Sequence, residues 1–400
     1  MHSTEAHPVS RIKRFLTILA VLFFAANLRA PLTSVGPVIG EISEYLSLSK
    51  TVAGMLTTLP LLAFGVLSSL IPRTSQRYGM ELVLFFSLIL LGLGLGVRSI
   101  GSLFTLFLGA ALVGTAITFG NVLMPAFIKI KFPKKIGVIM GIYSVGMNLT
   151  AALAAGLSIG IGRWTGIGWR ASIGIWILFS IIGILIWIPQ LLSKKPINTK
   201  ASNQKEAKEK VNIFTSKLAW AVTVFMGLQS LIFYCLSAWL PKVAQDWGMS
   251  IDASGWILSY LQFAQLPTTF IGSIIAARIR DQRILGAITG VLLIIGIIGI
   301  LLFKTQWIIL CCVLLGIGSG LAFSLSMLLF VLRTQSSHGA AKLSGMAQSF
   351  GYLIAATGPP IFGSIYDIYN SWTLSFVFLL IVSLFILLAG IIAGQDRFIE

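Results

Sequence analysis

The stretch Asn27-Leu-Arg-Ala-Pro-Leu-Thr-Ser-Val-Gly-Pro37 places one charge and two prolines inside a run of residues that is otherwise apolar. This run begins after the basic cluster at residues 11–14 and ends near Glu41. Arg29 therefore lies about 15 residues beyond that cluster, or roughly 22 Å along an α-helix. A guanidinium at that depth in a membrane costs on the order of 3 kcal/mol or more. We therefore expect Arg29 to face a hydrated cavity or an anion.

The composition around this stretch is that of a membrane protein. The 400 residues are 56% hydrophobic and only 10% charged, and the mean hydropathy is +0.94. These values predict an all-α polytopic membrane protein. The net charge of +17 does not indicate nucleic-acid binding, because the Lys and Arg residues lie in short segments between apolar runs. The three cysteines lie within apolar runs, which favours packing over a disulfide framework.

The apolar runs predict twelve transmembrane helices in two six-helix bundles. One long polar segment, residues 193–215, reads as a flexible cytoplasmic linker between bundles at 14–192 and 216–394. Cytoplasmic tails are expected at 1–13 and 395–400. The expected spans are residues 14–40, 51–71, 81–98, 102–128, 136–162, 170–192, 216–240, 253–277, 284–303, 306–332, 341–366 and 372–394.

Positive charge sets the expected orientation of these helices. With the amino terminus inside, the inside segments carry 22 Lys and Arg residues and the outside segments carry six. Cytoplasmic loops of membrane proteins are enriched in these residues. We therefore expect a multi-pass protein of the cell membrane with both termini in the cytoplasm. The first apolar run lacks a small-residue cleavage site, so no cleavable signal peptide is expected.

The two halves of the sequence resemble each other weakly. Pro37 and Pro241 each lie at the outer end of the first span of their half, in similar local sequences. Aligning them sets Arg29 against Phe233. The repeat therefore predicts pseudo-symmetry of the fold without a second buried charge.

These features together resemble the major facilitator superfamily, and five motifs resemble its CynX/NimT branch, named for cyanate and 2-nitroimidazole transport. The motifs are Asn27 to Pro37, Gly54-Met-Leu-Thr-Thr-Leu-Pro60, Gly120-Asn-Val-Leu-Met-Pro125, Phe132-Pro-Lys-Lys-Ile-Gly137 and Ala238-Trp-Leu-Pro241. The resemblance implies alternating access of two bundles to one site and a small nitrogen-containing or anionic solute. The superfamily's inner loop usually has an Asp before its basic residues, and Ile71-Pro-Arg-Thr-Ser-Gln-Arg-Tyr-Gly79 has none.

Uncharged polar residues within the spans complete the predicted solute site. Each would be costly facing lipid, so each either hydrogen-bonds to another helix or lines a cavity. Glycine pairs such as Gly156 with Gly160 and Gly286 with Gly290 are instead expected to pack helices closely. The predicted substrate-binding residues are Arg29, Asn27, Thr33, Asn121, Tyr143, Gln229, Tyr234, Gln262, Gln265, Gln348 and Tyr352.

The acidic residues and histidines all lie outside the middle of the spans. Each Asp and Glu falls in a tail, a loop or the end turns of a span, and the histidines lie at positions 2, 7 and 338. A metal cluster or a set of nucleophile, base and acid cannot be assembled from them in a central cavity. We therefore predict no enzymatic activity, no metal and no cofactor.

The leading hypothesis is a monomeric secondary transporter in which Arg29 anchors a cyanate-, nitroimidazole- or monocarboxylate-like solute. The second half is expected to contribute neutral donors or an aromatic wall. Because no acid lies mid-span, we predict exchange, facilitated diffusion or a proton carried on the solute. Two alternatives stay open: an efflux transporter of drugs or metabolites with the same fold, and a transporter-like sensor, which would usually need an added output domain.

Overall fold

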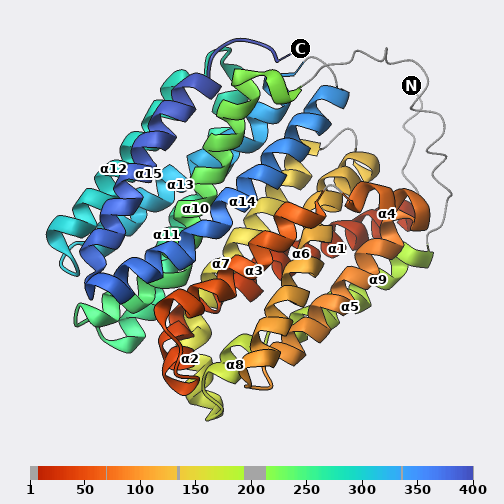
Figure 1. Ribbon diagram of the computed structural model, residues 1–400. Helices are drawn as coiled ribbons and strands as arrows, with labels where there is room; N and C mark the ends of the chain where they lie inside the picture. The colour runs from red at the N-terminus through yellow and green to blue at the C-terminus, as the bar shows by residue number, and fades with distance from the viewer. Residues whose placement is uncertain (1–7, 69, 133–135, 193–212, 335–336, 400) are drawn as a thin grey trace, which may run out of the picture.

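The computed structural model describes residues 8–68, 70–132, 136–192, 213–334 and 337–399, and within them helices joined by short loops form the fold, without strands (Figure 1). The first half comprises α1 (Pro8–Thr33), η1 (Gly36–Val38), α2 (Ile39–Tyr45), α3 (Lys50–Leu67), α4 (Ile71–Tyr78), α5 (Met80–Arg98), α6 (Leu103–Lys131), α7 (Ile136–Thr165), α8 (Trp169–Gly174) and α9 (Ile177–Leu192). The second half comprises η3 (Ile213–Thr215), α10 (Lys217–Asp246), α11 (Ile251–Arg278), α12 (Arg283–Phe303), α13 (Ile308–Leu332), α14 (Ser337–Tyr369) and α15 (Trp372–Ala393).

The long helices follow the twelve predicted spans. Among the described residues, ten helical segments are long and apolar enough to cross a membrane. The remaining two long helices, α11 and α14, have 28 and 33 residues and are more polar, because they carry several of the predicted glutamines and tyrosines. Gln262 and Gln265 are buried within the bundle, while the same two helices also expose large apolar residues, among them Ile271 of α11 and Ile368 of α14. Most of the predicted linker, residues 193–212, lies outside the described residues.

The first predicted span is not one continuous helix. Helix α1 begins at Pro8, six residues before the expected start, and ends at Thr33, two residues beyond Pro31. A proline has no N–H for the carbonyl four residues earlier, so Pro31 weakens the helix at this turn. The chain then forms the short helices η1 and α2 before α3 begins. The break begins one helical turn after Arg29.

The two halves meet along two pairs of helices, α3 with α14 and α7 with α11. Glycines allow the close approach: a Cβ on Gly54 would lie 2.7 Å from the Pro359 carbonyl oxygen, and one on Gly156 would lie 2.7 Å from Ser259 Oγ. Gly286 and Gly290 likewise pack on α15, as expected for packing glycines. Gly160 has open space around it, so the packing role predicted for that residue is wrong.

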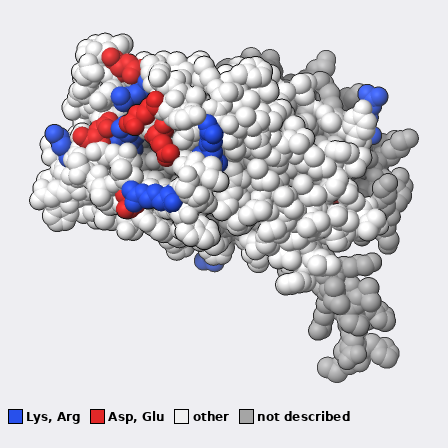
Figure 2. Space-filling view, turned by 90° about the horizontal axis from the view of Figure 1, so that it is seen from below, with Lys and Arg blue, Asp and Glu red and all other residues white. Residues whose placement is uncertain are grey.

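The end of the bundle opposite the start of α1 and the end of α15 is here called the far end. Charged side chains gather there, at the left of Figure 2, and the band beside them is uncharged. Large apolar residues are exposed along the helices, among them Leu93, Leu185 and Phe385. An uncharged apolar band beside a charged end is the surface expected of a protein embedded in lipid.

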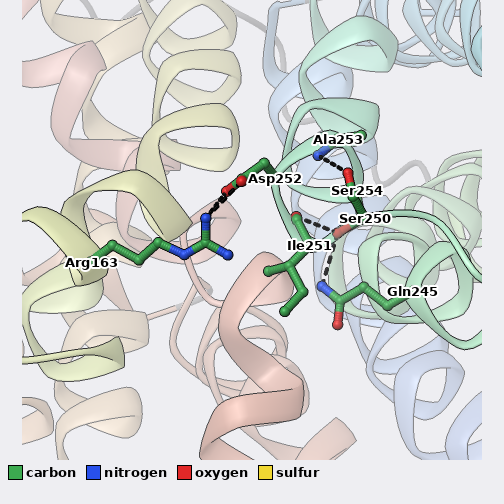
Figure 3. Close-up of polar contacts among 7 residues, drawn as sticks. All are labelled: Arg163, Gln245, Ser250, Ile251, Asp252, Ala253 and Ser254. Carbon is green, nitrogen blue, oxygen red and sulfur yellow. Dashed lines mark hydrogen bonds and ion pairs between the residues drawn. The ribbon is translucent and has the colours of Figure 1, made fainter.

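Two polar contacts join the halves at the far end. Arg163, at the end of α7, pairs with both oxygens of Asp252, in the first turn of α11 (Figure 3). On the other side, Asp367 of α14 accepts hydrogen bonds from the backbone N–H groups of Lys50 and Thr51, at 3.2 and 2.8 Å. These N–H groups belong to the first turn of α3, where a carboxylate is favoured. The far end is therefore closed between the halves, and we call the two contacts the far-end latches.

Candidate functional site

Arg29 lies on α1, one turn before the helix ends, and its side chain is partly buried. Its guanidinium carbon lies 4.5 Å from the ring centroid of Phe233 in α10 and 5.2 Å from that of Phe323 in α13. Both rings belong to the second half. A guanidinium over an aromatic face is attracted by the ring quadrupole. The cation of the first half therefore faces an aromatic wall in the second half.

No carboxylate in the described ranges neutralises the charge of Arg29. Within the part of the chain that the structure describes, the Arg29 side chain forms no ion pair and no hydrogen bond. Tyr234 and Tyr352 line the same cavity as Arg29. A buried charge usually has a paired counter-charge, because leaving it unpaired costs several kcal/mol. The donors of Arg29 are thus available to an anionic ligand.

A small cavity surrounds the guanidinium at the meeting point of five helices. Its free space is about 20 Å³, room for about one water molecule. A solute of several atoms therefore needs the helices to move apart before it can bind. The lining residues are Arg29, Gln229, Ser230, Phe233, Tyr234, Gln265, Ser319, Phe323 and Tyr352.

Five of the predicted site residues line this cavity: Arg29, Gln229, Tyr234, Gln265 and Tyr352. Tyr143 is buried and is not among the lining residues. Gln229 donates a hydrogen bond from Nε2 to Ser230 Oγ at 2.9 Å, which orients its amide. The second half contributes amides and hydroxyls here, and no acidic residue is among the lining residues.

The remaining predicted residues do not line the cavity in this structure. Asn27 donates from Nδ2 to carbonyl oxygens in α1 and α9, and Thr33 donates to the carbonyl of Ala151 in α7 at 3.1 Å. Gln348 donates to Ser344 Oγ at 2.9 Å. These three side chains contribute hydrogen bonds within or between helices.

Two further predicted residues have no such partner among the described residues. Asn121 is partly buried, and no hydrogen bond from its side chain is found in the described chain. Gln262 is fully buried on α11, one turn before Gln265, and neither its amide nitrogen nor its amide oxygen has a partner in the described part of the chain. A buried amide without partners costs about 1–3 kcal/mol. Gln262 is therefore suited to meet a ligand or water when the helices separate.

Four lining residues were not among the predicted site residues: Ser230, Phe233, Ser319 and Phe323. The sequence does point to Phe233, because the internal repeat aligns it with Arg29, and the two side chains are in contact in the structure. Ser319 lies in the Gly316-to-Gly320 run, which has a packing pattern, and Phe323 has no polar signal at all. Apolar lining residues are hard to recognise in a sequence where most residues are apolar.

A second guanidinium was also missed. Arg98 lies at the end of α5, where the sequence places it among the outside charges. In the structure its side chain is 2% exposed, and its Nη1 donates to the carbonyl oxygen of Pro31 at 2.9 Å. The local apolar sequence gives no signal that this loop-proximal residue is buried.

Comparisons with known proteins agree with this architecture. The family model described as Major Facilitator Superfamily matches residues 15–356 and, in an overlapping match, 226–396. The chain is 41% identical over 395 residues to the uncharacterized transporter YycB of Bacillus subtilis (strain 168), covering 98% of this chain and 97% of that protein. It is 35% identical over 384 residues to the 2-nitroimidazole transporter of Escherichia coli (strain K12), covering 96% of both.

A more distant relative and a solved structure extend the comparison. The chain is 27% identical over 362 residues to the cyanate transport protein CynX of Escherichia coli (strain K12), covering 90% of this chain and 92% of that protein. A crystal structure of a bacterial homologue of the human lysosomal transporter Spinster, inward-facing and unoccupied, superposes with a TM-score of 0.77 at 16% identity. That likeness covers 98% of this chain and 99% of the other and shows a shared fold. The predicted family and fold class are confirmed.

Proposed function

We propose, from the premise that this chain belongs to the major facilitator superfamily, that it carries a small monovalent anion or nitro compound across the cell membrane, with Arg29 as the anchor. The chain is a membrane transporter and not an enzyme. The named relatives carry 2-nitroimidazole and cyanate, which are compact solutes with an electron-rich end. Both halves of the site come from one chain, so a monomer is sufficient.

The observation that carries this proposal is the guanidinium of Arg29, which has no counter-charge among the described residues. Guanidinium presents paired donors in one plane and matches a carboxylate, a nitro group or a linear anion. The rings of Phe233 and Phe323 hold the cation without neutralising it. One positive charge among neutral lining groups suits a monovalent solute better than a divalent one.

The direct test is counterflow into proteoliposomes. Vesicles loaded with unlabelled solute are given labelled cyanate, 2-nitroimidazole or benzoate, and exchange of label is measured. At least one of the three is expected to enter in a protein-dependent way. If none enters and sulfate does, the proposed solute class is wrong.

Gln265 tests the role of the second half. It is the lining amide of α11, and its replacement by leucine removes the polar group while keeping a similar volume. A hydrogen bond to a charged ligand contributes about 1.5–3 kcal/mol, so Gln265→Leu should raise the KM for uptake about 10-fold or more. Gln348→Leu is the matched control, because Gln348 lies outside the lining set in this structure and should have a smaller effect. An unchanged KM in Gln265→Leu would remove this residue from the site.

The expected orientation places the far end outside the cell, because Lys and Arg concentrate at the other end. The far-end latches then hold the transporter closed toward the outside. Both latches use a carboxylate of the second half, Asp252 or Asp367, against the first half. Opening to the outside requires both contacts to break.

The double substitution of Asp252 and Asp367 by Asn should shift the protein toward the outward-open state. An exposed ion pair and a helix-end carboxylate together contribute about 1–2 kcal/mol, so the shift should be about 5- to 30-fold. An impermeant maleimide can report this opening by labelling the variant Ser237→Cys. Residue 237 lies beside Gly36 at the far end. The control is Asp281→Asn, whose ion pair with Arg283 stays within the second half. Equal labelling of the double variant and the control would show that the latches do not hold the closed state.

A second candidate function is efflux of planar heterocycles or drugs. Four aromatic residues line the cavity: Phe233, Tyr234, Phe323 and Tyr352. Aromatic faces bind planar compounds without requiring charge. Efflux from loaded cells would favour this candidate if Arg29→Ala exported neutral heterocycles normally while losing anions.

A further inference from the structure

Arg98 is a second guanidinium buried in the first half. It is the last residue of α5 and is 2% exposed. Helix α6 presses against its backbone, because a Cβ on Gly109 would lie 2.5 Å from the Arg98 nitrogen. Nη1 donates to the carbonyl oxygen of Pro31 at 2.9 Å, while Nε and Nη2 have no hydrogen-bond partner among the residues that the structure describes. The proposed solute contacts do not use this residue.

The position of Arg98 explains how its charge is tolerated. Within the described residues it pairs with no carboxylate. It lies at the carboxyl end of its own helix α5 and contacts the carboxyl end of α1, which ends at Thr33. Helix carboxyl ends present unsatisfied carbonyl groups and a partial negative charge, and a cation there is stabilising. Arg98 therefore acts as a charged cap on the interrupted helix α1.

The end of α1 is held by contacts to two helices. On one side, Arg98 of α5 binds Pro31. On the other, Ser158 of α7 donates from Oγ to the carbonyl oxygen of Ser34 at 3.0 Å. Because Pro31 has removed a helical hydrogen bond at this turn, the helix alone does not fix its last residues. Arg29 lies only two residues before Pro31, so its position depends on these contacts.

We propose that Arg98 is a positioning residue, which caps the broken end of α1 and so holds Arg29 against the aromatic wall of the second half. This inference rests on the proposed function of Arg29 as anchor. Its structural part, the fixing of the α1 end, does not require any solute.

The test uses Arg98→Met and Arg98→Lys and two measurements on the full-length protein. Hydrogen exchange reports the stability of the α1 end: Arg98→Met should lower the protection of the amides at residues 32–36 about 10-fold, because the Pro31 carbonyl loses the side-chain donor that Arg98 provides. Uptake of cyanate or benzoate reports whether Arg29 is held in position. In Arg98→Met the KM for uptake should rise about 10-fold while kcat changes less than about threefold.

Lysine should rescue both measurements to within about threefold, because an ammonium reaches a single carbonyl and keeps the charge at the helix end. This differs from the expectation for Arg29, where a planar fork is needed. Arg397→Met, at an exposed position after α15, is the control for loss of an arginine. Ser158→Ala should also lower amide protection at residues 32–36 and raise the KM, each by a smaller factor than Arg98→Met. This variant tests the proposal if Arg98→Met does not fold.

Three outcomes overturn the proposal: protection of residues 32–36 unchanged in Arg98→Met, Arg98→Lys behaving like Arg98→Met, or local exchange rising without any change in KM. If no solute is transported by the unmodified protein, the proposed function fails, while the exchange measurement still decides whether Arg98 holds the α1 end.

Discussion

Arg29→Ala should reduce uptake of small anions by about 30-fold or more, because truncating one member of a buried charged contact costs about 2–5 kcal/mol. Arg29→Lys should fail as well, since lysine keeps the charge and loses the planar pair of donors. Both variants should be produced and folded, because the Arg29 side chain forms no ion pair or hydrogen bond in the described chain. Initial uptake into proteoliposomes, normalised to protein content, measures the effect.

The matched control is Arg397→Ala, which removes an exposed arginine after α15 and should transport normally. An intermediate rate for Arg29→Lys would show that charge alone provides most of the binding. Normal uptake by Arg29→Ala would exclude an anchoring role for this residue.

Exchange of solutes is the second large expected effect. Loading proteoliposomes with an unlabelled substrate anion should stimulate uptake of labelled anion at least about 10-fold, because an unpaired guanidinium is costly in an occluded site.

An imposed pH gradient without internal solute should not drive accumulation of an anion that does not protonate. The described carboxylates lie in loops, end turns or short helices, among them Glu81, Asp246 and Asp396. An arginine side chain keeps its proton in proteins, so it offers no substitute proton carrier.

The control for proton coupling is the pair of single variants Glu41→Gln and Asp252→Asn. Glu41 accepts a hydrogen bond from the backbone N–H of Trp169 at 3.1 Å, and Asp252 belongs to a far-end latch. If a pH gradient alone drives accumulation and either variant abolishes it, the coupling group lies at a helix end and obligatory exchange is wrong.

Hydropathy was sufficient to predict the helices, because lipid requires long apolar segments with internally satisfied backbones. The twelve-helix pattern also predicted α11 and α14, although these two helices are less apolar than the other ten. The break of α1 after Thr33 follows from the sequence only in part. Pro31 predicts a weak turn, but the length of η1 and α2 depends on packing against α7 and α10.

The candidate site was harder to predict than the fold. Arg29 and the glutamines at 229 and 265 stand out because polar groups are rare in the spans. The sequence does not show which way each side chain points, so Asn27 and Thr33 were grouped with the lining residues although they bond to neighbouring helices. Arg98 was missed for the opposite reason, because burial at a helix end depends on tertiary contacts.

Equilibrium binding to the purified protein tests the central claim most directly. Cyanate, 2-nitroimidazole and benzoate are titrated into the unmodified protein, Arg29→Ala and Arg397→Ala, and the heat of binding is recorded. We expect one site per chain for at least one ligand in the unmodified protein and in Arg397→Ala, and an affinity lowered about 30-fold or more in Arg29→Ala. Equal affinity in Arg29→Ala, or no binding of any of the three ligands to the unmodified protein, would contradict the account.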